Sequence, residues 1–538
     1  MARFSGLIVV VCAALAARAD DLSAQRIRAH VKFLSSDLME GRGVGARGGD
    51  LATGYLAAQF ELAGLQPAGD QGAYFQRVPL VGVETKSSAR LSAAGRGRTA
   101  DFRWIDDWVG ASNTQASETR LDAEAVFVGH GIVAPEYKWN DYEGADVRGK
   151  IVVLFTNEPP STDPAFFNGR ALTYYGRWTY KFEEALRQGA LGAIIIHTTP
   201  TAGYGWPVVR NSWGREQPFV RLAKGERGLS LAAWVTGEAG ARMLALAGRT
   251  PEELLKLAGS SGFRAIPLGI RISGALPTRI REIQTRNVVA MVPGSDPKLK
   301  SEAVVFTAHW DHLGVGTPVN GDAIYNGAVD NATGCGILLE LARAWAALPQ
   351  KPRRSAVFAA VTAEEGGLRG SEFYAQHPAI PAGKTAVAFN FDAIFPFGIT
   401  RDVVVTGAER TTFWPVVEQT ARRMRLTIKP DPRPEQGSYY RSDHFSMARA
   451  GIPAFTIGGG SEFEGKSNGF AEQLFREFNA RHYHEPSDEF QEDWDFSGLE
   501  QKARFALLMG LDAANQGALP TWNEGDEFRA AREKSLQQ

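Results

Sequence analysis

Cysteine is almost absent from this sequence. Only Cys12 and Cys335 occur among its 538 residues. Because Cys12 lies in an N-terminal stretch that we expect to be removed, the remaining thiol could form no disulfide within the chain. Cys335 stands between two glycines at the start of an apolar helical pattern, where we expect a small buried residue rather than a nucleophile. Stability must therefore come from the apolar core and from any bound metal.

The sequence also has no excess of positive or of negative charge. The chain has 59 Lys and Arg residues against 60 Asp and Glu residues, which gives a formal net charge of −1. It therefore has no basic field to hold a nucleic acid and no polybasic segment to anchor it to an anionic membrane. We expect no nucleic-acid partner.

Long apolar runs are missing as well. The run at residues 7–17 has about 11 residues, whereas a bilayer span needs roughly 20, so we expect no membrane span in the mature chain. This run follows Arg3 and ends in Ala17-Arg18-Ala19, which is typical of a secretory signal peptide with an A-x-A cleavage site. We predict cleavage near Ala19 and a secreted or periplasmic protein.

The length exceeds what one core supports and predicts two or three domains. From about residue 110 to 275 the chain shows short β-like runs separated by Gly, Pro and Asn, whereas the flanking parts show longer helical and strand patterns. The predicted organisation is a signal peptide at 1–19, a first domain part at 20–109, an insert at 110–275, a second domain part at 276–515 and a polar tail at 516–538.

Three predicted apolar strands each end on an ionisable side chain. Strands are expected at 303–308, 355–362 and 386–391, and they are followed by His309, by Glu364 and Glu365, and by Asp392, respectively. Further strands at 402–406 and 453–457 alternate with helices at 334–348 and 412–424, which indicates a mostly parallel α/β sheet. Since such sheets bind ligands at the carboxyl ends of their strands, we expect these side chains along one edge.

Two more candidate ligands stand at element ends. Asp330 follows His309 by 21 residues and precedes an apolar helical pattern, and His484 lies in the polar loop 483–489 before the final helix. Each has an ordinary alternative, because a histidine at a strand end is usually hydrogen-bonded structure and an aspartate before a helix is usually an N-cap. Taken together, imidazole and carboxylate donors suit zinc.

Five segments resemble, in order, the metal-site motifs of the M28 family of co-catalytic dizinc aminopeptidases and carboxypeptidases. They are HWDH (309–312), GAVDNATG (327–334), AEEGGLRGS (363–371), NFDA (390–393) and YHEPSDE (483–489). Residues 40–43 and 74–76 are typical of the opening of the same peptidase domain. The resemblance implies an α/β fold in which helices flank a mostly parallel mixed sheet, two Zn²⁺ per chain and a peptide substrate.

The resemblance also implies a role for each residue. Asp330 would bridge the two ions, and the remaining ligands would be His309 and Asp392 on one ion, Glu365 and His484 on the other. Glu364 would be the general base that takes a proton from the metal-bridging water and returns it to the leaving amine. Asp311 would orient the imidazole of His309. Candidates for substrate contact are His312, His444 and Tyr440, with structural hydrogen bonding open for both histidines.

The insert at 110–275 resembles the protease-associated (PA) domain that many M28 members carry. The resemblance rests on three stretches, Gly129–Ile132, Asp146–Val152 and Gly189–Ala193. The insert is also rich in aromatic residues between Tyr174 and Trp213. These rings could roof an active site and bind peptide side chains, or they could simply pack the insert.

We therefore expect an exported dizinc exopeptidase, an aminopeptidase that removes N-terminal residues from peptides. A carboxypeptidase or dipeptidase of the same family is an alternative, because the metal site is shared and the pocket decides which terminus is held. A glutaminyl-cyclase-like transferase and a non-catalytic receptor with the same fold are further alternatives. Every expected ligand and the base are present, which counts against the receptor. The sequence sets no oligomeric state.

Overall fold

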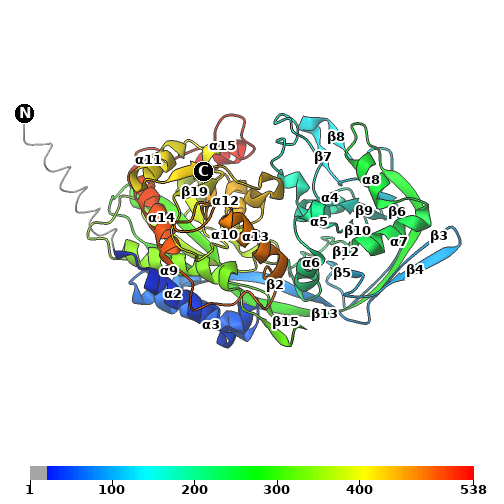
Figure 1. Cartoon of the computed structure of the whole chain (residues 1–538), viewed down its shortest axis with the longest axis horizontal. Coiled ribbons are helices and arrows are strands. Elements are labelled where there is room, and N and C mark those ends of the chain that lie inside the picture. The colour runs from blue at the N-terminus through cyan, green and yellow to red at the C-terminus, as the bar shows by residue number, and fades with distance from the viewer. Residues whose placement is uncertain (1–20, 538) are drawn as a thin grey trace, which may run out of the picture. The chain divides into compact units, whose positions relative to one another are not determined.

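The computed structural model describes residues 21–537, so the predicted signal peptide lies outside the described part (Figure 1). The chain divides into two compact units. The first unit contains the residues up to Val78, Gln284–Pro432 and the residues from Arg441 onward. The second unit contains Pro79–Ile283 and Arg433–Tyr440.

The sheet of the first unit is mostly parallel. Four neighbouring parallel strands form its centre, in the order β17 (Ser355–Val361), β14 (Ala303–His309), β18 (Thr385–Asn390) and β21 (Ala454–Gly458). On one side the end of β13 (Ile266–Val292) pairs antiparallel with β17 and with β1 (Gln66–Pro67). On the other side β19 (Asp402–Thr406) pairs antiparallel with β21 and parallel with β20 (Thr427–Lys429). The predicted mostly parallel mixed α/β sheet is confirmed.

Helices cover both faces of this sheet. Phe306 of β14 faces α9 (Thr333–Ala346) and α14 (Ser497–Asn515), where its ring lies 5.6 Å from that of Trp345. The next residue, Thr307, faces the other side, because successive strand residues alternate. There it bonds to Asn390, whose amide donates to Ser442 beside α12 (His444–Arg449).

The core of the first unit is aromatic at its centre. Phe306 stacks on Phe358 and on Phe389, with 5.1 Å between ring centroids in each pair. Such pairs add about 0.5–1.5 kcal/mol each beyond the burial of their area. The remaining elements of this unit are α2 (Ala24–Leu34), α3 (Arg47–Leu62), β15 (Gly314–Val319), β16 (Asp322–Tyr325), α10 (Arg369–Gln376), α11 (Trp414–Met424) and α13 (Phe470–Arg481).

The C-terminal segment is more ordered than a polar tail. Residues 529–536 form α15 (Arg529–Leu536), and Trp522 and Arg532 are both fully buried. The Arg532 guanidinium donates hydrogen bonds to the carbonyls of Pro520, Ala382 and Thr385. No apolar periodicity in the sequence predicts this packing. It depends on the buried side chains of Trp522 and Arg532.

The second unit starts earlier than the predicted insert at 110–275. It begins at Pro79, because β3 (Arg90–Gly95) and β4 (Arg98–Phe102) join its sheet through β13. The strand order is β5-β12-β10-β9-β6-β13-β3-β4. The bounds not yet given are β5 (Trp108–Ala111), β12 (Leu231–Val235), β10 (Gly192–Ile196), β9 (Ile151–Phe155) and β6 (Glu118–Phe127).

Short helices and aromatic clusters complete the second unit. The helices are α4 (Trp178–Arg187), α5 (Thr199–Ala202), α6 (Trp206–Trp213), α7 (Gly237–Ala247) and α8 (Pro251–Ala258), and further strands are β2 (Phe75–Thr85), β7 (Val133–Ala134), β8 (Trp139–Asn140) and β11 (Gln217–Val220). Tyr175 lies 5.0 Å from Tyr180, and Trp178 lies 5.3 Å from Trp213 between ring centroids. These aromatic rings therefore contribute to packing inside the unit.

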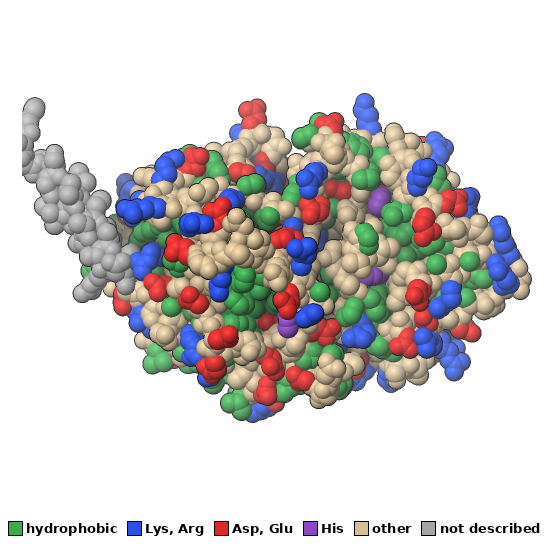
Figure 2. All heavy atoms as spheres, in the orientation of Figure 1, with side chains coloured by type: hydrophobic (Ala, Val, Ile, Leu, Met, Phe, Trp, Pro, Cys, Tyr) green, Lys and Arg blue, Asp and Glu red, His purple; other side chains and the backbone are tan. Residues whose placement is uncertain are grey.

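The surface agrees with the balanced composition. Basic and acidic side chains are intermingled on the face shown in Figure 2. Within residues 21–537, no helix has both the length and the apolar character needed to cross a bilayer.

Candidate metal centre

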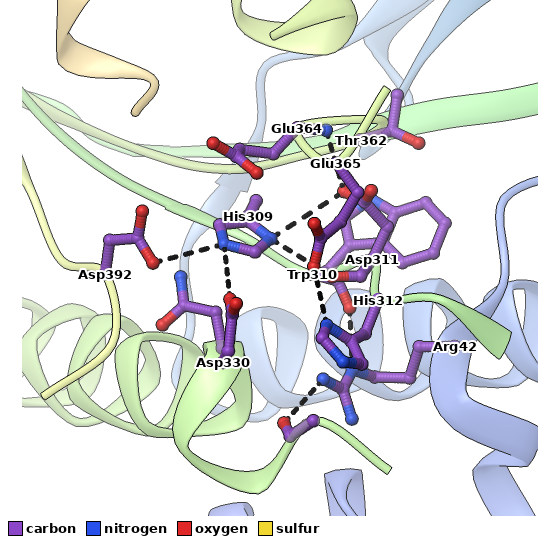
Figure 3. A network of polar contacts seen from close by, with 12 residues as sticks. Arg42, His309, Trp310, Asp311, His312, Asp330, Thr362, Glu364, Glu365 and Asp392 are labelled. Carbon is purple, nitrogen blue, oxygen red and sulfur yellow. Dashed lines mark hydrogen bonds and ion pairs between the residues drawn. The ribbon is translucent and has the colours of Figure 1, made fainter. Parts of the chain in front are cut away.

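The ends of three parallel strands bring four of the predicted residues together (Figure 3). Strand β14 lies between β17 and β18 and is parallel to both, so the three carboxyl ends meet at one edge. His309 is the last residue of β14, Glu364 and Glu365 follow β17, and Asp392 follows β18. The placement expected from the sequence is thus observed.

Asp330 lies between two pairs of side chains. It sits in the turn immediately before α9, and its Oδ1 is 3.3 Å from Nε2 of His309, which is also 3.3 Å from Oδ1 of Asp392. Its Oδ2 is 3.5 Å from Nε2 of His484, which is 3.0 Å from Oε2 of Glu365. Asp330 therefore presents one carboxylate oxygen to each pair.

Two groups of candidate metal ligands have Asp330 in common. Atoms of His309, Asp330 and Asp392 lie within 4.8 Å of one another, and so do atoms of His312, Asp330 and Glu365. That spacing suits ions bound at about 2.0–2.2 Å from each nitrogen and oxygen. Imidazole nitrogens together with carboxylate oxygens are the donor set that zinc takes in such sites.

The cluster carries a surplus of negative charge. Burial alone would lower the pKa of His309, but the carboxylates of Asp392 and Glu364 outweigh it and hold that pKa well above its usual value. Burial likewise opposes protonation of His484, yet Glu365 and Asp330 raise its pKa to about 9. Burial raises the pKa of Glu364 well above its usual value. The surplus of carboxylates favours cation binding.

Asp311 contacts the site differently from the expectation. Nδ1 of His309 donates a hydrogen bond to the backbone carbonyl of Asp311 at 3.0 Å, so Nε2 is directed at Asp330 and Asp392. The Asp311 carboxylate is 3.9 Å from that nitrogen and instead accepts a hydrogen bond from the Glu364 backbone N–H at 3.2 Å. The carboxylate thus fixes the backbone at Glu364, and the carbonyl orients the imidazole.

The three predicted substrate contacts lie in different places. His312 is buried within the ligand cluster, with Nδ1 at 2.6 Å from Oε1 of Glu365. His444 is fully buried in α12. Tyr440 belongs to the second unit, where its ring lies 6.2 Å from that of Tyr174. A substrate role for His444 and Tyr440 stays a prediction.

Arg42 is a fully buried residue of the segment 40–43, for which the sequence predicts no role at the site. Its guanidinium donates to the carbonyls of Trp310 at 2.7 Å, Leu34 at 2.7 Å, Asn326 at 2.6 Å and Gly327 at 2.8 Å. Trp310 is the residue after His309, and Gly327 lies three residues before Asp330. Arg42 therefore ties together the two backbone segments that carry these ligands.

We expect Arg42→Lys to destabilise the protein. A lysine offers three donors from one point, so it cannot reach four separated carbonyls, and each buried carbonyl left unpaired costs about 1–3 kcal/mol. The free energy of unfolding in urea should fall by at least about 2 kcal/mol. The matched control is Arg47→Lys, at an exposed arginine paired with Glu40, which should change it by no more than about 0.5 kcal/mol. Equal effects would contradict this role.

Asp488 is a second residue that was missed, although it lies in the predicted motif YHEPSDE. Its carboxylate accepts hydrogen bonds from the backbone N–H groups of Val329 at 2.9 Å and Asp330 at 3.0 Å, and its carbonyl accepts one from Ala328 at 3.0 Å. It stands four residues after His484. One short loop thus supplies a candidate ligand and fixes the backbone of the shared one.

Comparison with known proteins points to one family. Residues 287–508 match the model of peptidase family M28. Leupeptin-inactivating enzyme 1 of Streptomyces exfoliatus is 27% identical over 183 residues, which cover 33% of this chain and 36% of that protein. A probable zinc metalloprotease of Pyricularia oryzae (strain 70-15) is 39% identical over 95 residues, or 18% of each chain. The matches thus span about a third or less of these relatives.

A solved structure has a similar fold over nearly the whole chain. The aminopeptidase from Aneurinibacillus sp. strain AM-1 superimposes with a TM-score of 0.54 at 20% identity, and the match covers 94% of this chain and 98% of that one. The similarity extends through both compact units. The part of the chain that carries the candidate ligands, residues 287–508, is thus the part that is similar to peptidase family M28.

Proposed function

We propose that this protein is an exported dizinc metallo-exopeptidase that removes N-terminal residues from peptides. The observation that carries the proposal is the place of Asp330, which offers one oxygen to His309 and Asp392 and the other to Glu365 and His484. Two zinc ions bound there would lower the pKa of a shared water and stabilise the charge that develops on the substrate carbonyl oxygen.

Glu364 is the general base in this proposal. It is adjacent to Glu365 in the turn after β17, and the two carboxylates point apart (Figure 3). Glu365 faces His484 and His312, whereas no histidine among the described residues 21–537 forms such a pair with Glu364. Its carboxylate is free to take a proton from the attacking water and to deliver it to the nitrogen of the leaving amine.

Export and a PA-like second unit belong to the same proposal. Export is supported by the apolar run at 7–17 with Ala17-Arg18-Ala19 after it. The PA-like assignment is supported by the separate compactness of Pro79–Ile283 and by its own mixed sheet. Protein isolated from outside the cytoplasm should begin near Asp20.

A substrate panel tests the proposed specificity. Zinc-loaded protein would be assayed on aminoacyl anilides, on their N-acetylated analogues and on N-blocked dipeptides with a free carboxylate. We expect turnover only where the α-amine is free, with reversible loss on chelation and recovery on adding zinc. Cleavage of the N-blocked dipeptides would show a carboxypeptidase, and two bound zinc ions without any turnover would favour the receptor alternative.

A further inference from the structure

The carboxylate of Glu365 lies between two imidazoles. Oε1 is 2.6 Å from Nδ1 of His312, and Oε2 is 3.0 Å from Nε2 of His484. The side chains of all three residues are at least nine-tenths buried. Each oxygen of this one carboxylate therefore has its own histidine.

The position of His312 is fixed by backbone contacts that do not involve Glu365. A Cβ added at Gly327 would lie 2.5 Å from Cγ of His312, so the ring occupies the space that this glycine leaves. The backbone N–H of His312 donates to the Arg42 carbonyl at 3.4 Å, and the Arg42 guanidinium donates to the Gly327 carbonyl at 2.8 Å. The ring is thus located by backbone contacts on both sides.

The position of His312 determines which oxygen of Glu365 faces Asp330, the ligand that both metal positions share. Nδ1 of His312 lies 2.6 Å from Oε1 in an ion-pair contact, which is close enough for a charge-assisted hydrogen bond, so Oε1 is the oxygen that faces His312. Oε2 remains on the side of His484, whose Nε2 is also 3.5 Å from Oδ2 of Asp330. The three atoms that converge on the second metal position are then Oε2 of Glu365, Nε2 of His484 and Oδ2 of Asp330.

We infer that His312 is a positioning residue for Glu365, which donates from Nδ1 to Oε1 and thereby presents Oε2 alone to the second zinc ion. The inference rests on the two-zinc site of the proposed function and gives His312 a role other than substrate contact. The competing role is that of a direct ligand, because atoms of His312, Asp330 and Glu365 are also close enough to share an ion. The two roles make different demands on the side chain.

Two amide substitutions separate these roles. In His312→Asn the amide group takes about the place of Nδ1 and can donate to Oε1, whereas in His312→Gln it takes about the place of Nε2. Neither amide nitrogen replaces an imidazole as a zinc ligand. Both variants bury a neutral amide at the same position, so they are matched in polarity.

The measurement is the affinity for each of the two zinc equivalents, obtained by competition with a chromophoric zinc chelator on the mature full-length protein. We expect His312→Asn to bind both ions within a few-fold of the wild type. His312→Gln should bind one ion normally and the other about 10–100-fold more weakly, as is typical when the hydrogen-bond partner of a ligand is lost. Thermal unfolding of the metal-free proteins should show that both variants fold.

Two results would overturn the inference. If both variants lost the second zinc equally, His312 would be a ligand, and if both kept it, the contact with Oε1 would have no positioning effect. Failure of the proposed function is distinguishable, because a wild type without peptidase activity could still show the expected difference between Asn and Gln in zinc affinity. A wild type that binds only one zinc ion would contradict both.

Discussion

Glu364→Gln is expected to lower kcat by about 10²–10⁴-fold while both zinc ions stay bound, because general-base removal costs that much. This corresponds to roughly 3–5 kcal/mol of activation free energy. Glutamine keeps the shape of the side chain but cannot accept the proton of the attacking water. The loss should therefore fall on kcat, with KM, zinc content and the unfolding transition close to those of the wild type.

The matched control is the neighbouring residue, Glu365→Gln. Its Oε2 lies 3.0 Å from Nε2 of His484, so we expect it to lower the occupancy of one zinc ion, and added zinc should restore part of the activity. Kinetics and zinc content would be measured for both variants in parallel. A Glu364→Gln protein that lost a zinc equivalent, or kept near-full kcat, would show that this pair of roles is wrong.

Asp330→Ala should be the most damaging single ligand change. Both oxygens of Asp330 face a histidine, at 3.3 Å on the His309 side and 3.5 Å on the His484 side, so its removal takes one donor from each metal position. We expect loss of both zinc equivalents after dialysis and loss of activity beyond that of any other ligand variant. Elemental analysis and kcat/KM would be measured together.

The control for Asp330→Ala is Asp392→Ala, which removes a donor on the His309 side alone. It should lose one zinc equivalent and keep the other. If Asp330→Ala retained one tightly bound ion, the shared role of Asp330 would be refuted. Because Asp330 also lies in the turn before α9, the circular dichroism of each variant should be compared with that of the metal-free wild type.

The strands and the candidate ligands could be predicted from the sequence for one physical reason. Fully buried parallel strands such as Val304–Ala308 read as continuous apolar runs, so their ends are marked by the first ionisable residue. The same pattern predicts that His309 and Asp392 lie at strand ends. Parallel pairing of β14 with β18 then brings them together.

The contacts that support the ligands could not be predicted, because they produce no periodic pattern in the sequence. Arg42 bonds to Trp310 and Gly327, which are 268 and 285 residues away, and all its acceptors are backbone carbonyls whose positions no side-chain pattern encodes. The same holds for Asp488, which bonds to backbone N–H groups of the turn before α9. The motif that contains it indicated a site without indicating this role.

The boundaries of the two compact units could not be predicted from the amino-acid composition either. The second unit begins at Pro79 because β3 pairs with the long strand β13 and β4 pairs with β3, and the pairing of β3 with β13 joins residues such as Ala94 and Arg271 that are far apart in the sequence. Arg433–Tyr440 belongs to the same unit, although the surrounding sequence belongs to the other. Such long-range pairing depends on the fold and cannot be predicted from the local amino-acid composition.

The most direct test of the central claim is an anomalous difference map from crystals of the zinc-loaded protein, recorded at the zinc absorption edge. The account predicts two peaks about 3.5–4 Å apart, the usual spacing in two-metal sites, with one between His309, Asp330 and Asp392 and the other between Asp330, Glu365 and His484. A single peak, or two peaks that do not share Asp330, would contradict it.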